Sequence, residues 1–282
     1  MKIRSAELDE QVFLAEGETI HRPSRLMVAY RRFDGWILGG TAVVLFIAFW
    51  QWVGTSGVVN PLFVSAPSRI WLAFLSLAQG DLLNDIAISS LEFVYGFTLA
   101  IAVGIPLGIL MGWYRPVEAL FNPFVNFFYA TPRIALLPLL IVWLGIGIHS
   151  KVAIVFLGAV FPVLINTIAG VKNLDESLIM AARSFGARDL QIFKTIALPG
   201  SVPFVLSGLR LGLGHALIGV VVGEFYAATA GVGYMIANAG NTFQTDKVFV
   251  GVIIVATAGL LITFGFQRLE DHFQSWRPQR SQ

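Results

Sequence analysis

The stretch Met180-Ala-Ala-Arg-Ser-Phe-Gly186, followed ten residues later by Ile196-Ala-Leu-Pro199, interrupts a chain that is otherwise strongly apolar. It belongs to a polar island, about residues 172–200, between two long apolar segments. The pattern predicts two short helices that meet at Gly186, where a residue without Cβ permits a sharp turn. A small-residue surface with such a turn suits docking into another protein. An ordinary interfacial loop is the alternative.

Within this island, the first helix is expected to be capped by Asn173, with Glu176 completing a capping box. Its apolar stripe would consist of four residues at helical spacing, Leu178, Ala181, Ala182 and Phe185. The second helix is expected to carry Asp189 in its first turn, with Leu190, Phe193 and Ile196 at helical spacing. We expect it to stop at Pro199, because proline cannot continue a helix.

The rest of the chain has the composition of a membrane protein. Hydrophobic residues make up 56% and charged residues 13%, against about 25% charged in a soluble domain. A spanning helix needs about 20 apolar residues, and six segments approach or exceed this length: about 36–53, 86–113, 117–146, 152–171, 203–228 and 248–267. Pro132 and Pro138 interrupt the third segment, which is therefore expected to be kinked or broken.

These segments predict an all-α membrane protein with six transmembrane helices. We expect a cytoplasmic N-terminal tail (1–35), a transmembrane domain (36–270) that contains the polar island, and a cytoplasmic C-terminal tail (271–282).

The distribution of Lys and Arg predicts the orientation. With both termini on one side, that side collects most of the basic residues: Lys2, Arg4, Arg22, Arg25, Arg31, Arg32, Arg115, Lys172, Arg183, Arg188, Lys194, Arg268, Arg277 and Arg280. The opposite loops are expected to hold only Arg69, Lys151 and Lys247. Since cytoplasmic loops are enriched in Lys and Arg, both termini and the 172–200 loop are expected to be cytoplasmic. The excess of basic residues then reflects topology, and no nucleic-acid partner is expected.

The residues that enzymes use are missing from the sequence or scattered along it. The glycine cluster Gly104-Ile-Pro-Leu-Gly108-Ile-Leu-Met-Gly112 lacks the Lys-Ser/Thr of a phosphate-binding loop. Its spacing favours close helix packing instead, as does that of Gly208, Gly212 and Gly219. The four histidines show no metal-ligand spacing, and there is no cysteine. We therefore expect no catalytic site and no cofactor or metal on this chain.

The island resembles the signature of bacterial ABC importer permeases: Glu-Ala-Ala, three residues, Gly, nine residues, Ile, one residue, Leu-Pro. The matching residues are Met180, Ala181, Ala182, Gly186, Ile196, Leu198 and Pro199, with Met180 in place of the family's Glu. In that family the segment is a coupling helix that seats on the cytoplasmic ATPase subunit. The resemblance therefore implies an ATPase-coupling role for these residues, between the fourth and fifth spans of a type I importer permease.

Further segments sharpen the resemblance to the nitrate/sulfonate/taurine/bicarbonate branch of these importers. They are Gly104–Gly112, Ala130-Thr-Pro-Arg-Ile-Ala-Leu-Leu-Pro-Leu139, Trp143-Leu-Gly-Ile-Gly147, Leu198-Pro-Gly-Ser-Val-Pro203 and Gly208-Leu-Arg-Leu-Gly212. Membership would imply a homodimer, two copies of an ATPase that carries ATP and Mg²⁺, and a periplasmic or lipid-anchored binding protein. The bacterial inner membrane would be the location, and a small, anionic solute such as a sulfonate, taurine, nitrate, bicarbonate or an organic acid would be the cargo.

Three charged residues fall within predicted spans and are candidates for the substrate path: Arg133, Arg210 and Glu224. Charges in hydrocarbon are costly, so each should face a cavity, a partner helix or another charge. Arg133 or Arg210 would form part of an electropositive path; alternatively, they anchor helix ends or pair internally. Glu92, near the start of the second span, is expected to be interfacial.

The predicted mechanism is alternating access, driven through the docked loop. A stand-alone secondary transporter or channel is the alternative, but it predicts inverted repeats and intramembrane acidic relays that the sequence does not show. A membrane scaffold without transport would require neither a broken helix nor buried charges.

Overall fold

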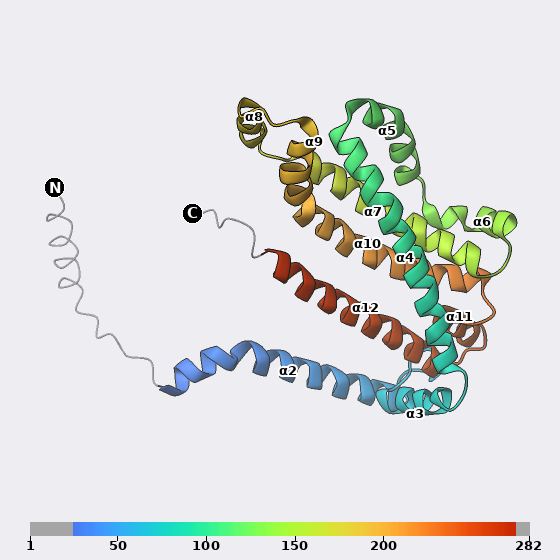
Figure 1. Ribbon diagram of the computed structural model, residues 1–282. Coiled ribbons are helices and arrows are strands. Elements are labelled where there is room, and N and C mark those ends of the chain that lie inside the picture. Colours follow the sequence, from blue (N-terminus) through green and yellow to red (C-terminus); the bar gives the residue numbers. More distant parts are fainter. Residues whose placement is uncertain (1–24, 275–282) are drawn as a thin grey trace, which may run out of the picture. The chain divides into compact units, whose positions relative to one another are not determined.

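The computed structural model describes residues 25–274, and all regular secondary structure in that range is helical (Figure 1). The elements are α2 (Arg25–Thr55), α3 (Pro67–Ala78), α4 (Leu82–Trp113), α5 (Arg115–Ala130), the 3₁₀ turn η1 (Arg133–Leu136), α6 (Leu137–Leu144), α7 (Ile148–Lys172), α8 (Glu176–Ser184), α9 (Asp189–Ile192), the π-helical turn η2 (Phe193–Ala197), α10 (Leu198–Ala227), α11 (Val232–Asn241) and α12 (Thr245–Gln274). Most of the predicted N-terminal tail, and the C-terminal tail beyond 274, lie outside the described residues.

The prediction of spanning helices is confirmed in the described part of the chain. Five helical segments are long and apolar enough to cross a membrane: Leu38–Thr55, Leu82–Trp113, Ile148–Lys172, Asp189–Ala227 and Thr245–Arg268. The expected break in the third span is also present, because Arg115–Ala130 and Arg133–Leu144 meet at an angle of 93°. Counting this bent pair as one span gives six.

The chain forms two compact units, Met1–Trp52 and Val53–Gln282. The described part of the first is a single apolar helix, most of α2. Every site discussed below lies in the second unit.

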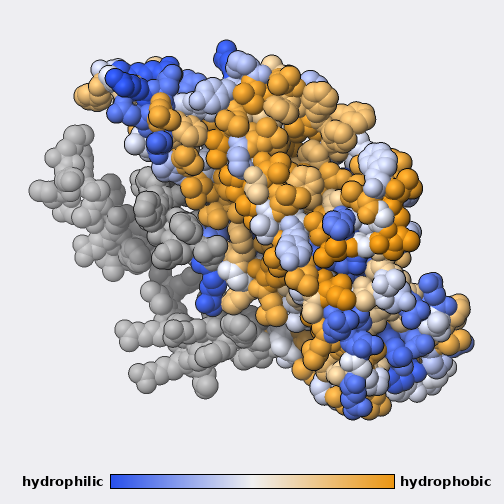
Figure 2. Space-filling model, turned by 45° about the vertical axis from the view of Figure 1, so that its right-hand side comes forward, coloured by the Kyte–Doolittle hydropathy of each residue, from blue (hydrophilic) through white to orange (hydrophobic). Residues whose placement is uncertain are grey.

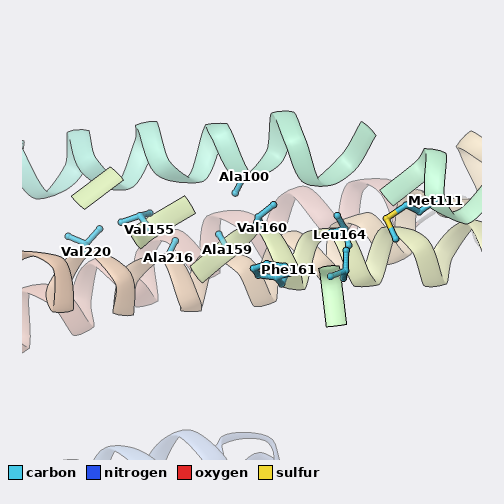
Figure 3. Close-up of a cluster of buried hydrophobic side chains, with 10 residues drawn as sticks. Ala100, Met111, Val155, Ala159, Val160, Phe161, Leu164, Ala216 and Val220 are labelled. Atoms are coloured by element: carbon cyan, nitrogen blue, oxygen red, sulfur yellow. The ribbon is translucent and has the colours of Figure 1, made fainter. Parts of the chain in front are cut away.

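At the centre of the second unit, α7 packs between α4 and α10. Figure 3 shows the apolar core there, with Ala100 of α4 and Ala216 and Val220 of α10 close to α7 side chains. Glycines make the close approach possible, as their spacing predicts. A Cβ on Gly104 would come within 3.1 Å of Val163, and one on Gly219 within 3.0 Å of the Val155 backbone. Small residues let membrane helices approach closely enough to gain packing energy without a hydrophobic driving force.

The glycine contacts also fix the direction of the helices. Gly96 faces Val155 and Gly112 faces Val171, so α4 and α7 run parallel. Residues 114–147 must therefore return the chain from the C-terminal end of α4 to the N-terminal end of α7. Despite its bend, the α5–α6 segment runs from one end of the unit to the other, which supports counting it as a single span.

Polar side chains gather at the two ends of this unit, with apolar surface between them (Figure 2). One end carries α8 and α9, where Lys172 pairs with Glu118 at 2.5 Å and Trp113 packs on Phe193 at 5.4 Å between ring centroids. The other end carries α3 and α11, two short helices that the sequence analysis did not predict.

Candidate functional site

The turn between α8 and α9 is built around Gly186, as predicted. Its φ is +79°, a conformation that favours glycine. The Gly186 amide donates to the Arg183 carbonyl, and the Ala187 amide donates to the Ala182 carbonyl. This pair of bonds is a Schellman motif, which satisfies two of the carbonyls that a helix C-terminus leaves free. The signature glycine therefore fixes the angle at which the chain leaves α8.

The start of α8 differs from the prediction. Asp175, and not Asn173, is the N-cap, and its carboxylate accepts from the Ser177 amide at 2.9 Å. Asn173 instead ends α7, where its side-chain amide donates to the Ala169 carbonyl. Both residue types make good caps, and the choice is decided by α7, which continues to Lys172.

Pro199 does not stop the second helix, contrary to the prediction. The chain passes from α9 through the π-helical turn η2 directly into α10, so that Asp189–Ala227 is one continuous apolar segment. The Leu198 amide donates to the Phe193 carbonyl five residues back. Pro199 then occupies the first turn of α10, where a missing N–H costs little.

The surface of α8 is largely unpartnered within the described residues. None of its residues is buried, and Phe185 at its C-terminal end is 92% exposed. Of the predicted apolar stripe, Leu178 and Phe185 are exposed and Ala182 is half-buried. The signature residues Met180, Ala181, Gly186, Leu198 and Pro199 are also exposed, whereas Ile196 is half-buried against the unit. An exposed large aromatic side chain beside exposed small residues is the form of a docking surface.

Arg133 lies at the break of the third span, where η1 begins. Its guanidinium donates to the Gly158 carbonyl at 3.1 Å and stacks against the rings of Tyr129 and Phe161. The carbonyl of Gly158 is free because Pro162, four residues later on α7, has no N–H to donate to it. Arg133, at the break of the third span, therefore satisfies the Gly158 carbonyl that Pro162 leaves without a donor.

A cavity of about 330 Å³ surrounds this contact, between the break, α7 and α10. Its lining includes Tyr129, Thr131, Arg133 and Ile134 from the break, Ile154 and Gly158 from α7, and His215, Ile218, Gly219 and Val222 from α10. Gly158 is ten residues from the start of α7, about 15 Å along the helix. The cavity therefore lies well inside the membrane-spanning part of the unit.

Arg210 lies elsewhere, on the part of α10 nearer the coupling loop. It pairs with Glu270 of α12 at 2.6 Å. This is the internal pairing that the alternative interpretation of Arg210 predicts. A role for Arg210 in the substrate path stays a prediction.

Glu224 is buried near the C-terminal end of α10 and anchors the start of α11. Its carboxylate accepts from the Ser89 hydroxyl and from the Gly233 amide, each at 2.6 Å. The neighbouring amides of Gly231 and Val232 donate to Asp85 and Ser89. Three acceptors from α4 and α10 thus satisfy successive amides at the N-terminus of α11, where a negative charge is favourable.

Lys151 lies in a helix and not in a loop, contrary to the prediction, whereas the placement of Glu92 at the membrane interface stays a prediction. Glu92 is fully buried on α4, and Lys151, in the first turn of α7, is 5% exposed and forms an ion pair with it. Because α4 and α7 run parallel in the register that places Gly96 opposite Val155, the two side chains meet one turn earlier. Glu224 is close enough to interact electrostatically with both. The sequence signal for this cluster was available: an acid within one apolar span and a cation at the edge of another.

The structure does not bring all the predicted path residues together. Arg133 lines the cavity at the break, Arg210 pairs with α12, and Glu224 belongs to the cluster that holds α11. His215, which the sequence analysis did not select, shares the Arg133 cavity.

Comparisons with known proteins agree with this architecture. Residues 104–275 match the family described as the binding-protein-dependent transport system inner membrane component. The chain is 37% identical over 248 residues to the putative aliphatic sulfonates transport permease protein SsuC of Bacillus subtilis, covering 88% of this chain and 90% of that protein. It is 34% identical over 243 residues to the taurine transport system permease protein TauC of Escherichia coli, covering 84% and 88%.

Solved structures with a similar fold include the MetNI methionine ABC transporter in an inward-facing conformation. The TM-score is 0.60 at 19% identity, over 68% of this chain and 95% of that one. An amino acid ABC transporter aligns with a TM-score of 0.56 at 17% identity, over 72% and 97%. These likenesses concern the fold. With the family match and the sulfonate and taurine permease relatives, they show that this chain belongs to the binding-protein-dependent inner membrane components, the permease subunits of ABC importers.

Proposed function

We propose that this permease carries a small organic sulfonate across the inner membrane, driven by a separate ATPase that docks on the α8–α9 segment. The observation that carries the docking proposal is the exposed surface around Phe185, set at a rigid glycine turn on the polar end of the unit. ATP and Mg²⁺ would be bound by the ATPase and not by this chain.

The continuity of η2 with α10 supports a mechanical role for this segment. A movement of α9 passes into a 39-residue helical segment with no flexible loop between them. That segment contributes four residues to the cavity at the helix break. Movement of an ATPase under α8 would therefore reach the middle of the membrane through one continuous helix, as alternating access requires.

A sulfonate is supported as cargo by the named relatives and by the charge of the cavity. SsuC and TauC are named for aliphatic sulfonates and taurine. Among the described residues, those that line the cavity include Arg133 and no carboxylate. A cavity with a net positive charge attracts an anion.

The residues exposed on the face that carries this cavity are an argument for a second copy of the chain as a partner. His215 and Ile218 are exposed on α10, and Arg133 is half-buried beside them. An Arg and a His at this depth do not face hydrocarbon at low cost. We propose that this face meets a second permease copy, and that the path runs between the two. With the 172–200 loop on the ATPase side, both termini would be cytoplasmic.

Reconstitution tests the proposed function. Proteoliposomes would contain this chain with its cognate ATPase and binding protein, and uptake of radiolabelled taurine, ethanesulfonate, nitrate and bicarbonate would be measured with and without ATP. We expect ATP-dependent uptake of a sulfonate. Uptake without the ATPase would support a stand-alone transporter instead, and uptake of nitrate or bicarbonate alone would contradict the sulfonate proposal.

A further inference from the structure

Arg133 differs from Lys151 and Arg210 in having no carboxylate partner among the described residues. Lys151 pairs with Glu92, and Arg210 pairs with Glu270. The interactions of Arg133 with described residues are with a backbone carbonyl and two aromatic rings. A positive charge at this depth is costly unless an opposite charge or water compensates it. The missing counter-charge is the observation from which the inference starts.

The structural role of Arg133 leaves most of its hydrogen-bonding capacity unused. A guanidinium has five N–H donors, and the structure gives one side-chain hydrogen bond, to the Gly158 carbonyl. Tyr129 and Phe161 hold its carbon atom at 5.6 and 5.8 Å from their ring centroids. These contacts position the side chain without neutralising it. A planar fork with free donors matches an oxyanion.

The cavity beside Arg133 provides room and walls for an organic anion. Its volume of about 330 Å³ lies within the range of small-molecule sites. The lining also contributes aliphatic side chains, those of Ile154, Ile218 and Val222. His215 also lines the cavity, and its Nδ1 donates to the Leu211 carbonyl at 3.0 Å, since a carbonyl can only accept.

We propose that Arg133 and this cavity form a substrate subsite inside the membrane, in which the guanidinium binds the sulfonate group of the cargo and the aliphatic side chains contact its carbon chain. The inference rests on the proposed function and names the residues that would carry it. The sulfonate supplies the counter-charge that no described residue provides at this position. Such a site need only be weak, because the cargo must also leave it.

Pro162 provides a way to separate binding from structure. If Arg133 serves only to satisfy the Gly158 carbonyl, then Pro162→Ala makes it dispensable, because alanine restores the N–H that bonds to Gly158 within α7. The test compares Pro162→Ala with Pro162→Ala/Arg133→Gln and Pro162→Ala/Arg133→Lys in the reconstituted complex. Complex yield and ATP-driven taurine uptake, with saturating loaded binding protein, are measured for each.

Relative to Pro162→Ala, we expect the Gln double variant to assemble in similar yield and to lose uptake by about tenfold or more, the effect of removing a charged hydrogen bond. The Lys double variant should retain more uptake, because it keeps the charge but not the fork. Equal uptake in Pro162→Ala and Pro162→Ala/Arg133→Gln would overturn the subsite. Failure of only the Gln double variant to assemble would also overturn it, since it would make Arg133 a structural residue.

The same series without Pro162→Ala, comparing Arg133→Gln with Arg133→Lys, covers the case in which Pro162→Ala alone prevents uptake. Here too, equal uptake by the two variants would count against an anion site. Absence of uptake of both taurine and ethanesulfonate by the unaltered complex would instead refute the proposed cargo, so the two failures are distinguishable.

Discussion

Single residues with a constrained backbone or a missing donor explain much of this molecule. Gly186 adopts φ +79° in the turn after α8, and apart from its chain neighbours no atom of the described residues lies within 4 Å of where its Cβ would be. A side chain there would therefore act through backbone strain and not through a clash within the chain. Pro162 has no N–H and therefore leaves the Gly158 carbonyl without its helical partner. Arg133 donates to this carbonyl instead.

Gly186→Val should weaken docking of the ATPase. A β-branched residue in the left-handed region costs about 1–2 kcal/mol, which the turn can relieve by changing the angle between α8 and α9. Gly186→Asn is the matched control, because asparagine tolerates this conformation. We expect the amount of ATPase that co-purifies with the membrane-inserted chain to fall for Val and to be largely kept for Asn. Equal amounts for both would mean that the turn geometry does not matter for docking.

At the scale of elements, α7 holds the unit together because both of its neighbours present small residues to it. The buried pair of Lys151 and Glu92 joins α7 to α4, and Glu224 links this cluster to α11. A buried ion pair is weak evidence of net stability, but removal of one partner leaves an uncompensated charge.

Lys151→Met should therefore destabilise the unit strongly, by about 3–5 kcal/mol, because it leaves the fully buried Glu92 without its cation. Adding Glu92→Gln to Lys151→Met should recover much of that loss. The measurement is the thermal unfolding midpoint of the purified chain in detergent, with the two variants compared side by side. If the double variant were less stable than Lys151→Met alone, the charge cluster would not be the cause.

The spans and the coupling turn were predictable from the sequence because their signals are local. Apolar runs give the spans, Pro132 and Pro138 give the break, and the position of Gly186 gives the turn. Lys151 and Glu92 are 59 residues apart in the sequence. Their pairing depends on the register between α4 and α7, which no local pattern fixes. Likewise, Pro162 shows that the Gly158 carbonyl needs a donor, but the sequence does not say that Arg133 supplies it. The predicted cap at Asn173 and the predicted stop at Pro199 were wrong, because α7 and α10 each extend further than their apolar runs.

At the scale of the whole molecule, the direction of each helix and the distribution of charge predict a topology. We expect cysteines introduced at Ser184 on α8 and at Gln79 after α3, into a chain without native cysteine, to react from opposite sides of the membrane. Both positions are exposed. In sealed right-side-out vesicles, an impermeant maleimide should label Gln79→Cys, and should label Ser184→Cys only after the membrane is opened. Labelling of both in sealed vesicles would refute the six-span topology.

The central claim is that an ATPase drives this permease through the α8–α9 segment, and photocrosslinking in the membrane tests it most directly. A photoreactive phenylalanine would replace Phe185, which is 92% exposed, and in a second chain would replace Val142 of α6, which is 78% exposed on an apolar helix. After irradiation of membranes that contain the whole importer, we expect an adduct with the ATPase from position 185 and none from position 142. An adduct of position 185 with the binding protein, or no ATPase adduct at that position, would contradict the account.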